Sequence, residues 1–146
     1  MKSEKIRVPA RIKPGDTIGI VAPAGPFDRQ TFLRGARIIE DMGFKIFSPP
    51  GLFEKNSYLA GSDNHRVQFV NQLFADTSID AIICARGGYG SMRILPMLDY
   101  DTIQNNPKIF IGFSDITILL SVLVSRCNLV TFHGPVVTSL TNASEE

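Results

Sequence analysis

The chain has 146 residues, of which 44% are hydrophobic and 20% charged, and its formal net charge is +1 from 15 basic and 14 acidic side chains. This composition is typical of one folded domain and excludes a largely disordered chain. The balanced charge argues against nucleic acid or an anionic membrane as a partner, because both bind clustered basic charge.

Two strands and two helices are predicted in the first half of the chain. Residues 17–22 are an apolar run between Pro/Gly turns, which is typical of a buried strand. Asp28 is a suitable N-cap for a helix that ends at Gly43, where a left-handed residue is favoured. A second strand over 44–47 stops at two prolines, and after a loop Ser62 or Asp63 caps a second helix that covers about 62–74.

The second half continues the alternation. Strands are predicted over 81–85, 108–112 and 129–132, with a short helix over 91–98 and a longer helix over 114–126. Apolar strands separated by amphipathic helices predict a doubly wound α/β fold. We therefore expect a mainly parallel sheet of about five strands with helices on both faces, a Rossmann- or flavodoxin-like three-layer sandwich.

Unusual sequence follows four of the predicted strands, whereas the loops that lead into the strands contain ordinary turn residues. The four segments are Ala-Pro-Ala-Gly-Pro at 22–26, Arg-Gly-Gly-Tyr-Gly at 86–90, Gly-Phe-Ser-Asp at 112–115 and His-Gly-Pro at 133–135. The carboxyl ends of parallel strands meet at one edge of the sheet, and ligands bind there in open α/β sheets. A functional site is therefore predicted at this edge.

Ser114 lies between the end of a strand and the start of a helix. A side chain in such a turn is held out over the sheet edge, and the amide of Asp115 would point at a reacting carbonyl near the positive end of the helix. The pattern also allows Ser114 to be simply the N-cap of the helix, because serine is a favoured cap and G-x-S-x-G fails at Ile116.

The second motif is the glycine-rich segment 86–90. Gly87 and Gly88 would let backbone amides approach a substrate oxygen closely. A dinucleotide-binding interpretation of Gly88-x-Gly90 is disfavoured because Arg93 occupies the third glycine position.

Together these motifs resemble the LD-carboxypeptidase family of serine peptidases, which includes the microcin-immunity hydrolases. The resemblance covers nearly the whole chain and implies that Ser114 is the nucleophile. It also implies an oxyanion hole formed by the amides of Asp115 and of Gly87 or Gly88. The family's catalytic Glu and His lie in a separate C-terminal domain, so residues 1–146 are expected to be the N-terminal nucleophile domain, with the C-terminal domain absent from this chain.

Three further side chains have alternative interpretations. Arg86 would bind a substrate carboxylate bidentately or pair with a nearby acid. His133 would act as a base, line the pocket, or order the turn before Gly-Pro, and the family takes its base from elsewhere. Asp115 is a candidate structural acceptor. No metal or cofactor is expected, because the chain has no Cys/His cluster and the family needs none.

By resemblance, the full-length protein would hydrolyse the L,D-amide bond of a murein tetrapeptide and release the terminal D-alanine. The alternatives are an immunity-type hydrolase of aminoacyl-nucleotide amides and a catalytically silent binding module. The isolated chain is expected to be inactive, since a serine hydroxyl needs an adjacent base. The resemblance implies homodimers. The absence of a signal peptide and of a membrane span indicates the cytoplasm.

Overall fold

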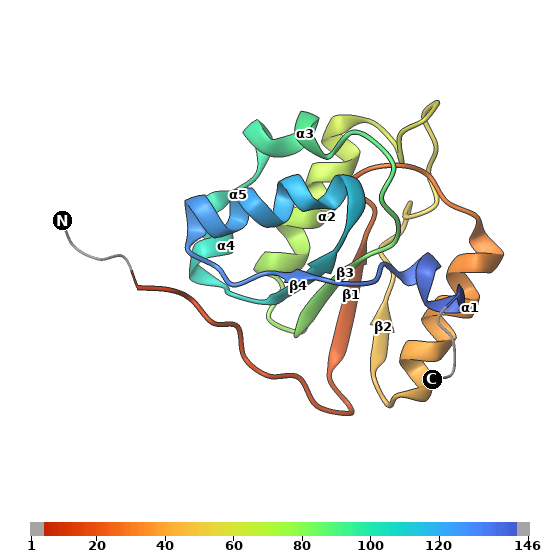
Figure 1. The fold of residues 1–146 in the computed structure, drawn as a ribbon, viewed down its shortest axis with the longest axis horizontal. Coiled ribbons are helices and arrows are strands. Elements are labelled where there is room, and N and C mark those ends of the chain that lie inside the picture. Colours follow the sequence, from red (N-terminus) through yellow and green to blue (C-terminus); the bar gives the residue numbers. More distant parts are fainter. Residues whose placement is uncertain (1–4, 143–146) are drawn as a thin grey trace.

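Five parallel strands form the central sheet of the computed structural model, which describes residues 5–142 (Figure 1). The strands are β1 (Thr17–Val21), β2 (Lys45–Phe47), β3 (Ala81–Cys84), β4 (Ile109–Gly112) and β5 (Phe132–His133). Their order in the sheet is β2-β1-β3-β4-β5, and every neighbouring pair is parallel. The predicted α/β fold class is confirmed.

Helices cover both faces of this sheet. They are α1 (Arg29–Asp41), α2 (Asp63–Ala75), α3 (Ser91–Ile94), α4 (Tyr100–Asn105) and α5 (Thr117–Cys127), with 3₁₀ turns η1 (Leu95–Met97), η2 (Ser114–Ile116) and η3 (Val137–Asn142). Helix α1 packs with η3 on one face, whereas α2, α4 and α5 lie on the other. The described helices therefore form one layer on each face of the sheet, and η3 is hydrogen-bonded to Ala85, directly after β3.

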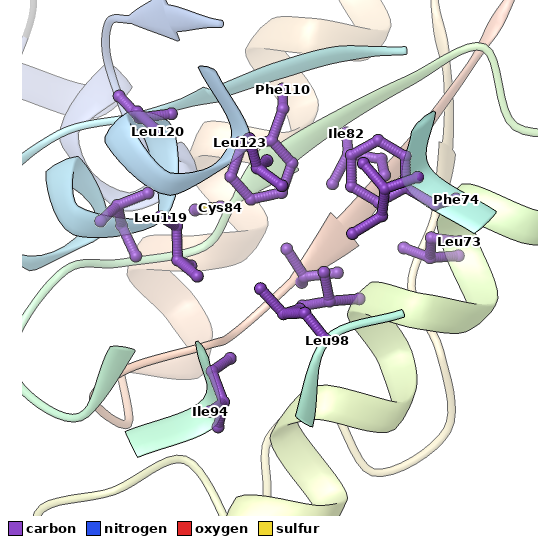
Figure 2. Close-up of a cluster of buried hydrophobic side chains, with 14 of the residues drawn as sticks. Leu73, Phe74, Ile82, Cys84, Ile94, Leu98, Phe110, Leu119, Leu120 and Leu123 are labelled. Atoms are coloured by element: carbon purple, nitrogen blue, oxygen red, sulfur yellow. The ribbon is translucent and has the colours of Figure 1, made fainter. Parts of the chain in front are cut away.

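The core divides into two clusters because strand residues alternate between the faces. In β3, Ile82 and Cys84 point to the side of α2 and α5, whereas Ala81 and Ile83 point to the side of α1. Figure 2 shows the larger cluster, where side chains of α2, β3, β4 and α5 converge. Each fully buried large apolar side chain of this kind contributes about 1.5–3 kcal/mol to folding.

Local signals placed the first two helices correctly. The carboxylate of Asp28 accepts a hydrogen bond from the Thr31 amide at the start of α1, and the Ser62 hydroxyl accepts one from the His65 amide at the start of α2. Gly43, just after α1, has a φ of +94°. These contacts confirm the predicted caps and the predicted end of α1.

The predicted position of the last strand is wrong. β5 comprises Phe132 and His133 rather than residues 129–132. Leu129 instead forms an isolated parallel bridge with Arg7, in which the Arg7 amide donates to the Asn128 carbonyl at 2.7 Å and the Val130 amide donates to the Arg7 carbonyl at 2.9 Å. An apolar run shows that backbone is buried but does not show which distant segment pairs with it.

Candidate active site

The strand order reverses between β1 and β3, and the loops after these two strands are joined there. The Gly25 amide donates to the Gly87 carbonyl at 3.0 Å. In sheets with this order, ligands bind where the order reverses, outside the carboxyl ends of the strands. Because all strands are parallel, the four unusual segments follow the same edge of the sheet, as predicted.

Ser114 is exposed on the turn after β4 and has a φ of +61°. A left-handed conformation at a residue with a side chain is strained, and such strain concentrates at functional sites. The residue that precedes the first helical turn is Phe113, and no side chain caps it. The interpretation of Ser114 as a helix N-cap is therefore wrong, and its hydroxyl makes no hydrogen bond within residues 5–142.

Gly87 is buried directly against this serine. A Cβ atom at position 87 would lie 3.0 Å from the Cβ of Ser114 and 3.2 Å from its hydroxyl oxygen. Within the described residues, the amides of Gly87, Gly88 and Asp115 donate no hydrogen bond. The structure thus places a strained serine against Gly87, and amides of both motifs have no acceptor in residues 5–142.

Asp115 links the serine turn to the glycine-rich loop. Its carboxylate accepts a hydrogen bond from the Ser91 amide at 2.9 Å, across the junction between the loop and α3. This contact supports the prediction that Asp115 is a structural acceptor. It also fixes the start of η2 relative to the end of the loop.

Arg86 follows β3 and His133 ends β5, the strands on either side of β4, and neither side chain is hydrogen-bonded to Ser114 in residues 5–142. The Arg86 guanidinium donates to the Pro26 carbonyl at 2.5 Å and has no acidic partner within residues 5–142. It lines a pocket of about 610 Å³ with Lys55 of the loop after β2, Thr138 of η3, and Pro26, Phe27, Asp28 and Thr31 at the start of α1 and just before it. The His133 ring packs edge-on against Phe113, with ring centroids 6.3 Å apart.

A buried arginine beneath the edge was not predicted. Arg66 on α2 is only 1% exposed, and its guanidinium donates to the carbonyls of Pro23 and Gly90 and pairs with Asp63. Arg93 donates to the same Asp63 carboxylate from outside. The i, i+3 spacing of Asp63 and Arg66 was a visible signal of an ion pair, but helical spacing could not show that the arginine is buried.

Two classes of site are not found in the described part of the chain. No group of three or more His, Cys, Asp or Glu side chains in residues 5–142 is arranged to hold a metal ion. No helix in this range combines the length and the apolar character needed to cross a membrane.

The fold and this edge define an α/β domain whose candidate site is a serine turn at the carboxyl ends of a parallel sheet. The model of the LD-carboxypeptidase N-terminal domain matches residues 18–134, and the chain belongs to this family. The resemblance noted from the motifs is confirmed.

Two curated relatives and one solved structure illustrate the similarity. A probable murein peptide carboxypeptidase of Bacillus subtilis is 37% identical over 90% of this chain and 41% of its own length. The Escherichia coli microcin C7 self-immunity protein MccF is 40% identical over 83% of this chain and 36% of its own length. A structure of an apo MccF active-site mutant, in which a serine, an asparagine and a lysine are replaced by alanine, superimposes with a TM-score of 0.89 at 33% identity, covering 94% of this chain and 42% of that one. The chain therefore spans less than half the length of these proteins.

Proposed function

We propose that this chain is the nucleophile-bearing domain of a serine-type LD-carboxypeptidase, which hydrolyses the L,D-amide bond of a murein tetrapeptide and releases the terminal D-alanine. The observation that carries the proposal is the strained turn that presents Ser114 beside Gly87, next to amides without acceptors in residues 5–142. The family and the name of the Bacillus subtilis relative support this choice of substrate.

In the proposed reaction, the Ser114 hydroxyl oxygen attacks the carbonyl carbon of the scissile amide. The amides of Asp115 and of Gly87 or Gly88 donate to the oxyanion that forms. Preorganised donors at this position account for a large part of catalysis, and loss of one typically lowers kcat by about 10²–10³-fold. The serine proton passes to the departing amine of D-alanine through a general base, and water then hydrolyses the acyl-enzyme.

We propose that the general base comes from the remainder of a longer protein, as a Glu and a His of a C-terminal domain. The chain has two histidines. His65 bonds to the Gly51 carbonyl and to Glu54, His133 packs against Phe113, and neither ring is hydrogen-bonded to Ser114 in residues 5–142. Residues 1–146 alone are therefore expected to be inactive.

Arg86 and His133 are proposed to contact the substrate. A carboxypeptidase must bind a free carboxylate, and arginine binds this group well. Arg86 lines the pocket next to the loops after β1 and β3, where Lys55 adds a second positive charge and Asp28 a negative one. The exposed His133 ring lies at the opposite side of the serine turn, beside Phe113, and would line the cleft there.

The test is hydrolysis of a murein tetrapeptide by the full-length protein and by its Ser114→Ala variant. We expect the variant to lose at least about 10³-fold in kcat, because a nucleophile is not replaced by its neighbours. Ser121→Ala is the matched control, since Ser121 is an exposed serine on α5 whose hydroxyl bonds to the Thr117 carbonyl. Equal rates for wild type and Ser114→Ala would refute the assignment.

A second candidate is hydrolysis of an aminoacyl-nucleotide amide, which the 40% identity to the MccF self-immunity protein favours. Comparing kcat/KM for the two substrates with one preparation decides between them. Binding of a substrate without hydrolysis would identify a silent binding module instead. We also propose that the protein forms a homodimer, which light scattering tests, and that it is located in the cytoplasm, which cell fractionation tests.

A further inference from the structure

A positively charged side chain is buried directly under the candidate site. Arg66 projects from α2 and is 1% exposed. One guanidinium nitrogen donates to two carbonyl oxygens, that of Pro23 at 2.5 Å and that of Gly90 at 2.9 Å. Because Pro23 follows β1 and Gly90 ends the loop after β3, this single group joins the two loops that meet at the reversal of strand order.

The positive charge of Arg66 is paired with a carboxylate that a second arginine also binds. The second guanidinium nitrogen pairs with Asp63, one turn earlier on α2, and Arg93 holds the same carboxylate from the surface at 3.0 Å. Burial lowers the pKa of Arg66, and the Asp63 carboxylate opposes that shift. A buried charge is costly unless it is paired and hydrogen-bonded, so a purely packing role would be served better by an apolar side chain.

The glycine-rich loop is fixed at both ends. At its start, the Gly87 carbonyl accepts from Gly25. At its end, the Gly90 carbonyl accepts from Arg66, and the next amide, that of Ser91, donates to the carboxylate of Asp115. The serine turn and the loop amides are therefore connected to α2 through Gly90 and Ser91.

Little space remains around this connection. A Cβ at position 90 would lie 2.5 Å from a methyl group of Leu59 and 3.0 Å from the Arg66 guanidinium, and Gly90 has a φ of +114°. The close fit couples the Gly90 carbonyl to the guanidinium, and the same carbonyl also accepts from the Arg93 amide at 3.1 Å in the first turn of α3. A shift of Arg66 is expected to move the loop that carries the free amides of Gly87 and Gly88.

We propose that Arg66 is a positioning residue of the catalytic site, which acts through the Gly90 carbonyl to hold the Gly87 and Gly88 amides in register with Ser114. This inference rests on the proposed serine hydrolase function. An oxyanion hole acts mainly in the transition state, so misplaced donors lower kcat more than they raise KM. Replacing a residue that only stabilises the fold would leave both kcat and KM of the folded molecules unchanged.

The test compares full-length Arg66→Met and Arg66→Lys with Lys108→Met. Lys108 is the matched control because it is also a buried cation that donates to two carbonyls, those of Leu73 and Asp76, near the other end of α2. All three variants are expected to melt at lower temperature. Only the Arg66 variants should lose kcat for the tetrapeptide, by about 10²-fold for methionine and about tenfold for lysine, with KM within about threefold of wild type.

Hydrogen exchange separates failure of this inference from failure of the proposed function. Exchange of the amides in segments 86–91 and 112–116, followed by mass spectrometry, needs no substrate. Faster exchange in these segments in the Arg66 variants, but not in Lys108→Met, supports the positioning role even if the wild-type protein does not cleave the tetrapeptide. If Arg66→Met does not fold, Arg66→Lys carries both measurements. Unchanged exchange in these segments, or a kcat equal to that of the control, overturns the proposal.

Discussion

Replacing Gly87 by alanine would place a methyl group against the proposed nucleophile. The new carbon would lie 3.0 Å from the Cβ of Ser114, whereas carbon atoms pack best at about 3.5–4.0 Å. The contact would be relieved by a shift of about 0.5–1 Å, and the exposed serine turn is the part most able to move. Because a misplacement of about 1 Å can cost about 10²-fold in rate, we expect kcat/KM to fall by that factor.

The same substitution should leave the fold intact. Gly87 has no positive φ, so alanine fits its backbone conformation, and the free energy of unfolding should change by less than about 1 kcal/mol. Gly19→Ala is the contrasting variant, because its Cβ would lie 2.8 Å from a methyl group of Leu73 in the core. It should lose about 1–3 kcal/mol of stability while each folded molecule keeps its activity.

The assay is tetrapeptide hydrolysis by the full-length protein, measured beside thermal and urea unfolding of the same samples. Activity is expressed per folded molecule, so that loss of stability does not count as loss of catalysis. Retention of more than about a third of wild-type kcat/KM by Gly87→Ala would refute the reasoning, since a 10²-fold loss follows from a misplaced nucleophile.

Three further variants test strain, packing and charge. Ser114→Gly should unfold in urea with about 1 kcal/mol more stability than Ser114→Ala, because glycine accepts the φ of +61° without strain, and equal stabilities would contradict this. Gly35→Ala should lower the free energy of unfolding by about 3 kcal/mol or prevent folding, since its Cβ would lie 2.0 Å from the Val137 carbonyl oxygen. An unchanged melting temperature would contradict this and show that η3 moves away without cost. The hydrogen bond from Arg93 is the main cause of the lowered pKa of Asp63, so the stability advantage of wild type over Asp63→Asn should be full above about pH 4 and disappear as pH falls through the lowered pKa. A constant difference from pH 7 to pH 2 would exclude this linkage.

The sheet was largely predictable because its signals are local. Apolar runs bounded by Gly and Pro located β1 to β4 within about two residues, and the caps at Asp28 and Ser62 located α1 and α2. Helix α4 was missed, although Asp99 caps it through the Thr102 amide, because residues 100–105 are too few to show a helical period.

The candidate site was predicted less completely, because part of it depends on contacts between distant segments. The motifs singled out Ser114 and the glycine-rich segment as candidates, and in the structure Gly87 packs against Ser114. The burial of Arg66 was not predictable, since its partners Pro23 and Gly90 lie in two loops far from it in sequence. The strained φ of Ser114 likewise became visible only when both flanking elements were in place.

The bridge between Arg7 and Leu129 has a consequence for how the chain folds during synthesis. The Arg7 side chain also reaches the Cys127 carbonyl at 3.2 Å, across a separation of 120 residues. A nascent chain emerges N-terminus first, so Arg7 is made before Cys127 and can contact it only after the intervening residues, a separation of 120, have left the ribosome. Contacts of such long range form late, because closing the intervening loop costs entropy. The segment around Arg7 is thus expected to be fixed late, while the sheet from β2 to β4 assembles without it.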